Sequence, residues 1–531
     1  MPRSKKTKSS FKRDEQGRVI LGSAKEMAAW VKLGFGEQNK NRNPLIPFWK
    51  EYIDLRNCVL YVSYPIDSEE PVSKIFNLCD IAGVVPGIEN VEGDPNYLFE
   101  VTKDIHLEGS ELYGNFFHYV KFDGMVKMDN VTIRSNFSCF KCLFQSFVYM
   151  QDIHITGRSD YEQCEFRKGL VLTGGIADLF HFNNCTINER LWMSSASLDN
   201  HHHKEYHQSI ELTNCSVEDL NLSAVNTNGL PIYLGDSKIN GMHLDKLALD
   251  SSVCFNSCVL DGIITSVKEE NGQKNNIKEV VFHGCELKGQ YHIENSDIEK
   301  FTFSFSNVSE SGRMRLSQCK IEELVAGCST ISGQMDLTEN EISEICLEDT
   351  CIQGFLNFQS NTIRKYTDRQ TLCLLKNEAR KVNDDVAATR LYAKEMRLLL
   401  ADKSISLWDK VSLWLSRLFS GFGENWVQAF FVTFGLSVVL TLAMLGIGSS
   451  KYGFDLTGEF IGIKSFISIL LDSINVFSIP LFRDTIEEYG LDVWGQILYF
   501  VIKLVVAYGT YQFVVAFRNM GGDKVDDSKV T

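Results

Sequence analysis

The 531-residue sequence lacks the short motifs that mark common catalytic mechanisms. It contains no HExxH, no GxSxG, no GxxxxGK[ST] and no GxGxxG loop following a strand. Acidic residues are scattered along the chain and are explained more simply as a solvated surface. We therefore predict that the protein is not an enzyme, and the sequence indicates no cofactor.

Positive charge is also scarce, with 53 Lys and Arg against 68 Asp and Glu and a formal net charge of -15. Nucleic-acid binding needs a basic surface that neutralises phosphates, so we expect no nucleic-acid partner. Residues 1–17 are the exception because Lys and Arg cluster there. We interpret this segment as a solvated, disordered basic tail, with contact to anionic lipid headgroups as the alternative.

The start of the chain has no apolar core of a signal peptide, which favours a reducing, cytosolic setting for the first part of the protein. The sequence nevertheless has 15 cysteines. Seven of them fall on a repeated position where small side chains are expected to point inward, and we interpret them as core residues. They are Cys142, Cys164, Cys185, Cys215, Cys258, Cys285 and Cys319.

That position belongs to a repeat that runs from Leu107 to Ile363. An apolar residue is followed after three positions by a small polar one, and after two more by a second apolar residue. In the second half the closing apolar residues are Leu287, Ile298, Val308, Ile321, Ile331, Ile342, Ile352 and Ile363. The two residues in each unit that point inward bury their apolar surface only if successive coils stack, which is typical of a solenoid.

The spacing predicts a right-handed parallel β-helix with four faces, about 21 residues per coil and roughly a dozen coils. The fold class is therefore mainly β with α. The repeat resembles the pentapeptide-repeat family, whose units place a large apolar residue at the centre and a small one two positions before it. Frequent Cys, Asn and Ser at the small position, and a regular six-residue step, depart from that family, so its DNA-mimic activity is not carried over.

Two groups could bind a metal ion, and we prefer a structural interpretation of both. His201, His203 and His207 lie in an insertion that we expect to form a solvated loop, with a metal site as the weaker alternative. Cys139 and Cys142 form a CxxC, but both fall on repeat positions and no second pair stands at zinc-ligand spacing. We therefore predict no metal site.

The C-terminal part has a different character, because two long apolar segments interrupt it. Residues 426–447 contain no charge and are long enough to cross a membrane as a helix. Residues 493–517 form a second candidate span. Residues 460–482 are apolar but carry charges and a proline, so we predict a re-entrant or interfacial segment there.

These features divide the chain into seven parts, in order along the sequence. A helix at Ala24–Leu33 is expected within the second part, which should cap the first coil. The parts are a basic tail (1–17), an N-terminal cap (18–106), the parallel β-helix (107–365), a connecting amphipathic helix (366–404), an interfacial helix (405–420), a transmembrane region (421–518) and a tail (519–531).

The acidic hairpin between the two spans contrasts with Lys403, Lys410 and Arg417 before the first span. The positive-inside rule then predicts a multi-pass protein of the inner (cytoplasmic) membrane with both termini and the β-helix in the cytoplasm. The arrangement resembles bacterial membrane proteins that join pentapeptide-like repeats to two C-terminal transmembrane helices.

Lys503 lies almost midway along the second span, where a lipid-facing charge is costly. Gln496 and Thr510, seven residues before and after it, complete a polar stripe at heptad spacing. The stripe predicts a pore-lining or oligomerising face. Pairing of Lys503 with Asp472, and snorkelling of Lys503 along the helix, are the alternatives.

We therefore expect a membrane-anchored cytosolic β-helix protein whose partners are the lipid bilayer and further copies of itself. In this hypothesis it forms an ion-channel-like pore or perturbs the membrane under control of the repeat domain, as an anti-phage or stress effector would. The alternative is a tethered scaffold without channel activity that binds a cytosolic protein on its β-helix. Residues 460–482 contain no TVGYG-like filter, so potassium selectivity is not expected.

Overall fold

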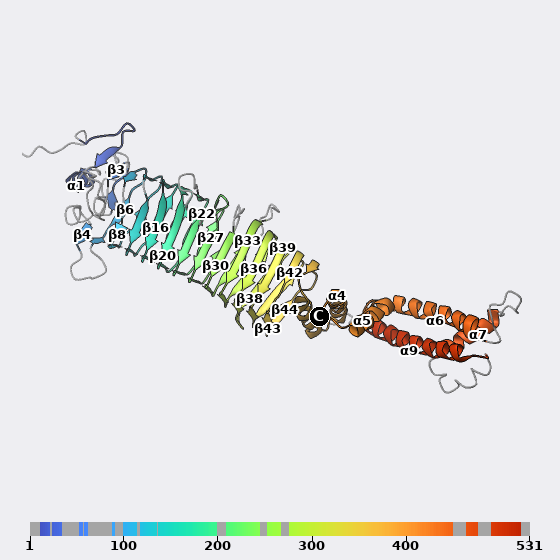
Figure 1. Cartoon of the computed structure of the whole chain (residues 1–531). Helices are drawn as coiled ribbons and strands as arrows, with labels where there is room; N and C mark the ends of the chain where they lie inside the picture. The colour runs from blue at the N-terminus through green and yellow to red at the C-terminus, as the bar shows by residue number, and fades with distance from the viewer. Residues whose placement is uncertain are drawn as a thin grey trace, which may run out of the picture. The chain divides into compact units, whose positions relative to one another are not determined.

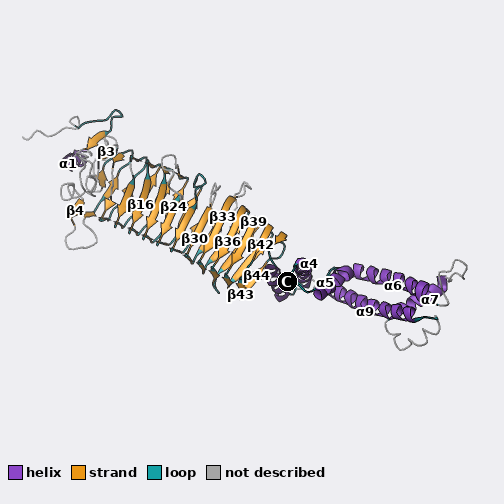
Figure 2. Cartoon of the chain, viewed as in Figure 1, coloured by secondary structure: helices purple, strands orange, loops and turns teal. Residues whose placement is uncertain are grey.

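The computed structural model describes residues 11–21, 24–33, 52–56, 58–61, 88–90, 99–113, 117–134, 136–198, 209–244, 252–266, 275–449, 463–475 and 490–521. The chain divides into two compact units, Met1–Lys365 and Tyr366–Thr531. The first unit is built from strands and the second from helices (Figures 1 and 2). Each unit is described by itself below.

The first unit is a parallel β-solenoid of about 11 turns, which confirms the predicted fold. Four sheets of 7, 13, 12 and 13 strands run along it, and consecutive strands of one sheet come from consecutive coils. Every described pairing between coils is parallel. A coil has about 22 residues, close to the 21 expected from the repeat.

Coils in the first half have one strand on each of four faces. One such coil consists of β14 (Val148–Gln151), β15 (His154–Ile155), β16 (Arg158–Glu162) and β17 (Glu165–Phe166). Side chains alternate between the interior and solvent along these strands. The interior holds stacked aromatic rings, including Tyr161 on Phe182 at 4.5 Å between ring centroids.

Coils in the second half have three strands, because one corner is crossed within a single strand. Here β38 (Arg313–Ser317) is followed by β39 (Lys320–Gly327) and β40 (Thr330–Ile331). Within β39, Glu322 and Glu323 are both exposed, so the chain bends outward there while Ile321 and Leu324 stay buried. The four inward positions persist although the expected fourth strand is fused with its neighbour.

The solenoid begins before Leu107, the boundary predicted from the sequence. The short strands β1 (Val19–Leu21), β2 (Tyr52–Asp54) and β3 (Cys58–Tyr61) already pair in parallel with one another or with strands of the first full coil. α1 (Ala24–Leu33) covers the range predicted for a helix, and it buries Met27, Trp30 and Val31. An antiparallel pair, β4 (Ile88–Asn90) and β5 (Phe99–Val101), completes this end.

The second unit contains six described helices, and its first two form a hairpin. α3 (Arg369–Lys381) and α4 (Asp385–Ala401) replace the single connecting helix expected over 366–404. The break occurs because Asn383 has a φ of 58° and the Asp384 side chain then accepts a hydrogen bond from the Ala387 amide, which caps α4. Glu395 of α4 is buried and pairs with Arg369 and Lys376 of α3.

The remaining helices are α5 (Leu407–Ser420), α6 (Trp426–Gly448), α7 (Ile463–Ile474) and α9 (Val493–Gly521). α6 and α9 are long and apolar enough to cross a membrane. They pack along each other, with α4 and α5 at one end of the pair and α7 at the other (Figure 1). Two candidate membrane spans are thus present, as the sequence predicted.

Candidate functional site

Two arrangements of buried polar side chains are candidates for a functional site, and the first is a row along one corner of the solenoid. In each coil a residue with positive φ makes the corner, and the next residue points inward. We call these inward residues the corner polar row: Cys142, Cys164, Cys185, Cys215, Ser237, Cys258, Cys285, Ser306, Ser329 and Thr350. All ten are buried.

Each member of the corner polar row donates a hydrogen bond to a backbone carbonyl of the coil before it. The Cys142 thiol reaches the Phe117 carbonyl at 3.1 Å, the Ser329 hydroxyl the Phe303 carbonyl at 3.0 Å, and the Thr350 hydroxyl the Ala326 carbonyl at 2.7 Å. The row therefore gives each buried polar side chain a hydrogen-bond partner in the preceding coil. This is the physical reason for small polar residues at that position.

The seven cysteines singled out from the sequence are buried and carry no disulfide, which supports their interpretation as core residues. Burial raises the pKa of the Cys164 thiol well above its ordinary value and that of Cys319 to about 11. The Cys164 and Cys319 thiols are therefore protonated at neutral pH and are poor nucleophiles. Cys139 and Cys142 also point into the core.

No group of three or more His, Cys, Asp or Glu among the described residues could hold a metal ion. His201, His203 and His207, the weaker metal alternative, lie outside the described residues. A polar depression on the solenoid has a volume of about 390 Å³ and includes Glu294, Arg315 and Glu339 among its lining residues.

The second candidate is Lys503 in the helical unit. It lies in α9, ten residues after the helix begins, and is only 6% exposed. Its ammonium donates to the backbone carbonyls of Asp472 at 2.6 Å and Asn475 at 2.8 Å. Both carbonyls lie at the C-terminal end of α7, and the Asp472 carbonyl also accepts a hydrogen bond from the Asn475 amide at 3.2 Å.

Pairing with Asp472 was one alternative for Lys503 in the sequence, and the structure brings the two residues together through the Asp472 backbone. The Asp472 carboxylate accepts a hydrogen bond from the Tyr499 hydroxyl at 3.4 Å. Lys503 also lies 5.0 Å from the centroid of the Tyr499 ring. Tyr499 was missed from the sequence although it precedes Lys503 by one helical turn, a spacing that could have identified it.

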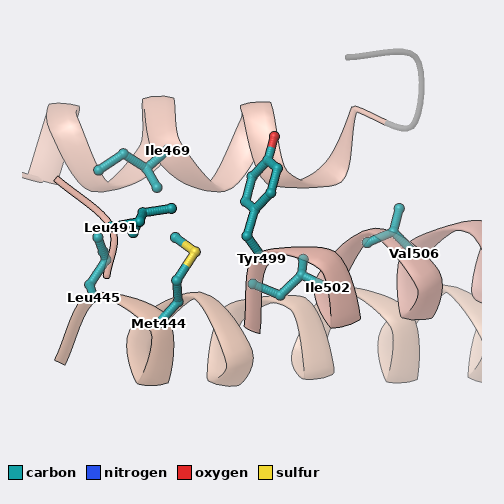
Figure 3. Packing of buried hydrophobic residues seen from close by; sticks show 7 residues of the cluster. All are labelled: Met444, Leu445, Ile469, Leu491, Tyr499, Ile502 and Val506. Atoms are coloured by element: carbon teal, nitrogen blue, oxygen red, sulfur yellow. The ribbon is translucent and has the colours of Figure 1, made fainter. Parts of the chain in front are cut away.

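The three helices meet in an apolar cluster that fixes this arrangement (Figure 3). Ile469 of α7 packs with Met444 and Leu445 at the end of α6 and with Leu491 before α9. Further along, Ile474 borders Val506 of α9. α7 therefore runs from the end of the helix pair toward its middle, and its C-terminus stops beside Lys503.

The predicted stripe of Gln496, Lys503 and Thr510 is not uniform. Lys503 is buried by α7, Gln496 is half-buried and bonds the Leu491 carbonyl at 3.3 Å, and Thr510 is exposed. Thr510 lies beyond the end of α7, in an apolar groove of about 160 Å³ between α6 and α9. The difference arises because α7 covers only part of α9.

A second buried contact joins α5 to α9. The Ser420 hydroxyl donates to the Gln512 side-chain oxygen at 2.7 Å, and the Gln512 amide donates to the Tyr508 hydroxyl at 3.0 Å. Next to it, Gly421, Phe422 and Gly423 all have positive φ and make the sharp turn into α6. The turn begins with the left-handed cap of α5.

Comparison with protein-family models, with curated proteins and with solved structures finds no match for this chain. The resemblance to pentapeptide repeats therefore rests on the residues of the repeat.

Proposed function

We propose that this is a membrane-anchored β-solenoid protein that assembles into an oligomer and forms a pore or perturbs the membrane. The contact between Lys503 and the end of α7 carries the proposal. A charge in the middle of a candidate span is costly in lipid. In this chain it is bonded to a helix of 12 residues, which is too short to cross a membrane.

A conducting path would need several copies, because two spanning helices cannot enclose an aqueous pore. Lys503 could line such a path only after α7 withdrew from α9 and released the ammonium. The described arrangement would then be the closed one, with α7 acting as the plug. Lysines around the open path would favour anions.

The solenoid is then the detector of this assembly, on the cytoplasmic side of the inner membrane with both chain termini. Lys403, Lys410 and Arg417 before α6 support this orientation. A rigid stack of coils presents flat faces to a partner without adding chemistry of its own. This division suits a conditional effector of the anti-phage or stress type.

The test is the conductance of the full chain in planar lipid bilayers. We expect anion-selective conductance in some condition that activates the wild type, and loss of anion selectivity in Lys503→Met, which keeps the side-chain length without the charge. Lys365→Gln, on an exposed solenoid lysine paired with Glu344, is the matched control and should conduct like the wild type.

Two results would overturn the pore. One is wild-type protein that never conducts, and the other is a protein that is monomeric in membranes by single-molecule photobleaching. A tethered scaffold is the second candidate function, favoured by the polar depression that includes Glu294, Arg315 and Glu339. The scaffold hypothesis predicts that the chain binds a partner protein whether or not it forms oligomers. It also predicts that Arg315→Glu abolishes this binding.

A further inference from the structure

α5 presents a row of apolar side chains to the outside of the helical unit. Four large apolar residues are exposed on it, each by about half or more: Leu407, Trp408, Val411 and Trp414. They recur at helical spacing on one face, whereas Ser420, on the opposite face, is buried. A helix of this kind lies flat at the boundary between headgroups and acyl chains.

Basic side chains border this apolar row. Lys410 and Arg417 are seven residues apart on α5, so they occupy one edge of the same helix. Their long aliphatic stems can lie along the apolar surface while the charges reach outward. Asp409 is the acidic residue on α5, and it is held at the helix start by a hydrogen bond from the Ser406 hydroxyl at 2.6 Å.

α4 adds a second basic edge. Arg390, Lys394 and Arg397 follow each other at four and three residues, so they share one face of the helix. Burial, opposed by Glu424 and assisted by Arg397 and Arg390, lowers the pKa of Lys394. Arg397 pairs with Glu424, the acidic group facing this edge from the turn before α6. In a chain with a net charge of -15, this concentration of positive charge is local.

α4 packs against the turn that follows α5, next to the start of the first candidate span. Phe422, in the turn between α5 and α6, is buried against Ala393 and Met396 of α4. α6 begins at Trp426, only six residues after α5 ends at Ser420. The basic edges and the apolar row therefore lie at the end of the helix pair where a bilayer would have its headgroups.

We propose that the α4–α5 surface binds the headgroups of anionic phospholipids. This surface comprises the apolar row of α5 together with Arg390, Arg397, Lys410 and Arg417, whereas the Lys394 ammonium donates to the Tyr366 hydroxyl at 3.5 Å. The aromatic and aliphatic side chains would enter the acyl boundary, and the ammonium and guanidinium groups would bind phosphate. The inference rests on the proposed membrane anchorage.

The experiment places the full chain in lipid nanodiscs that contain a trace of photoreactive phosphatidylglycerol or photoreactive phosphatidylcholine. We expect at least fivefold more cross-linking to phosphatidylglycerol, mapped by proteolysis to residues 390–417. Lys410→Gln/Arg417→Gln should reduce that preference at least threefold. Lys300→Gln/Lys365→Gln, which removes two exposed lysines of the solenoid, is the matched control and should keep the preference.

Equal cross-linking of both lipids, or a preference that survives the double variant, would overturn the inference. Extraction with alkaline carbonate separates this outcome from failure of the anchorage itself. A protein that stays in the membrane without headgroup preference contradicts only the lipid site. A protein that carbonate releases contradicts the proposed membrane function as well.

Discussion

Both units of this protein bury polar side chains, and they do so in opposite ways. In the solenoid the same arrangement recurs from coil to coil, with a small donor such as Ser329 bonded to the carbonyl of the preceding coil. In the helical unit Lys503 is the one charged side chain that is buried among the described residues of α6, α7 and α9, and it bonds the C-terminal end of α7. The repeated hydrogen bond indicates a structural role, because it pairs a backbone carbonyl in the same way in each coil. A buried charge within a candidate span is energetically costly and is not repeated, so it needs a separate explanation.

The largest expected effect is a loss of stability in the solenoid, the regular one of the two units. Phe303 is fully buried in a stacked coil, and Phe305, two residues later, is 65% exposed at a corner with a φ of 52°. We expect Phe303→Ala to lower the free energy of unfolding of the solenoid by about 3–5 kcal/mol, because it removes a ring from a packed core. Denaturant unfolding of the full chain in detergent, followed by circular dichroism, measures it.

Phe305→Asn is the matched control for that variant. Asn adopts positive φ with less strain than Phe, so the change should be neutral or stabilising. Equal losses from Phe303→Ala and Phe305→Asn would contradict this account of the core.

The next effect tests the hydrogen-bond function of the inward polar residues. Asn340, at the neighbouring corner, accepts from the Cys319 amide at 2.9 Å and donates to the Leu316 carbonyl at 2.9 Å. Asn340→Leu should cost about 1–3 kcal/mol because it leaves the buried Cys319 amide without its acceptor. The same unfolding measurement applies.

Asn340→Ser serves as the comparison, because Ser306 makes both kinds of bond at the equivalent place. It should lose less than half as much stability as Asn340→Leu. If the two variants unfold at the same denaturant concentration, packing and not hydrogen bonding explains the polar position of the repeat.

A comparable effect concerns the close contact of α6 and α9. A Cβ added at Gly509 would meet the Thr433 hydroxyl oxygen at 2.0 Å, and that hydroxyl already bonds the Ala429 carbonyl at 2.6 Å. Gly509→Ala should weaken the helix pair by about 1–3 kcal/mol through overpacking. The measurement is the mole fraction of dodecyl sulfate in mixed detergent micelles at which the helical unit of the full chain is half unfolded.

Gly435 of α6 gives the control, because nothing lies within 4 Å of a Cβ added there. Gly435→Ala should leave the unfolding point unchanged or raise it slightly. A loss at Gly435 as large as that at Gly509 would indicate instead that another copy of the chain packs on this exposed face.

The smallest effect is a pair of pH dependences with opposite sign. Burial lowers the pKa of His118, so folding becomes less favourable as the pH falls through 6.5 and the unfolded chain takes up the proton first. A hydrogen bond to Asp160 raises the pKa of His181, so its stabilisation is present below pH 6.5 and is lost as the pH rises through its folded pKa.

His118→Gln should therefore reduce the loss of solenoid stability between pH 7.5 and 5.5, and His181→Gln should increase it. Denaturant unfolding at both pH values measures the difference. Shifts of the same sign in the two variants would contradict the assigned environments.

The repeat made the solenoid predictable because its physics is local and periodic. The inward apolar residues and the small residues at the corners recur often enough to fix both the parallel stacking and a coil length near 22 residues. The two candidate spans and the helix at Ala24–Leu33 were also predictable from apolar patterning. The start of the solenoid before Leu107 was not, because β1 to β3 are short and show the repeat weakly.

The break between α3 and α4 was missed because a charged amphipathic stretch continues across it, and the left-handed Asn383 stops the helix for a backbone reason. The sequence did not predict that β39 continues across a corner as one strand. Its inward residues have the same spacing as they would have on two separate strands.

The sequence by itself determined the stacked coils, the inward cysteines and the two apolar helices, since each follows from a pattern of neighbouring side chains. Only the tertiary structure decided where Lys503 and Thr510 lie. Both occupy one predicted stripe, yet one is buried and the other exposed, because α7 folds back along α9 and ends between them. That contact joins residues about 30 positions apart, and no periodicity along the chain encodes it.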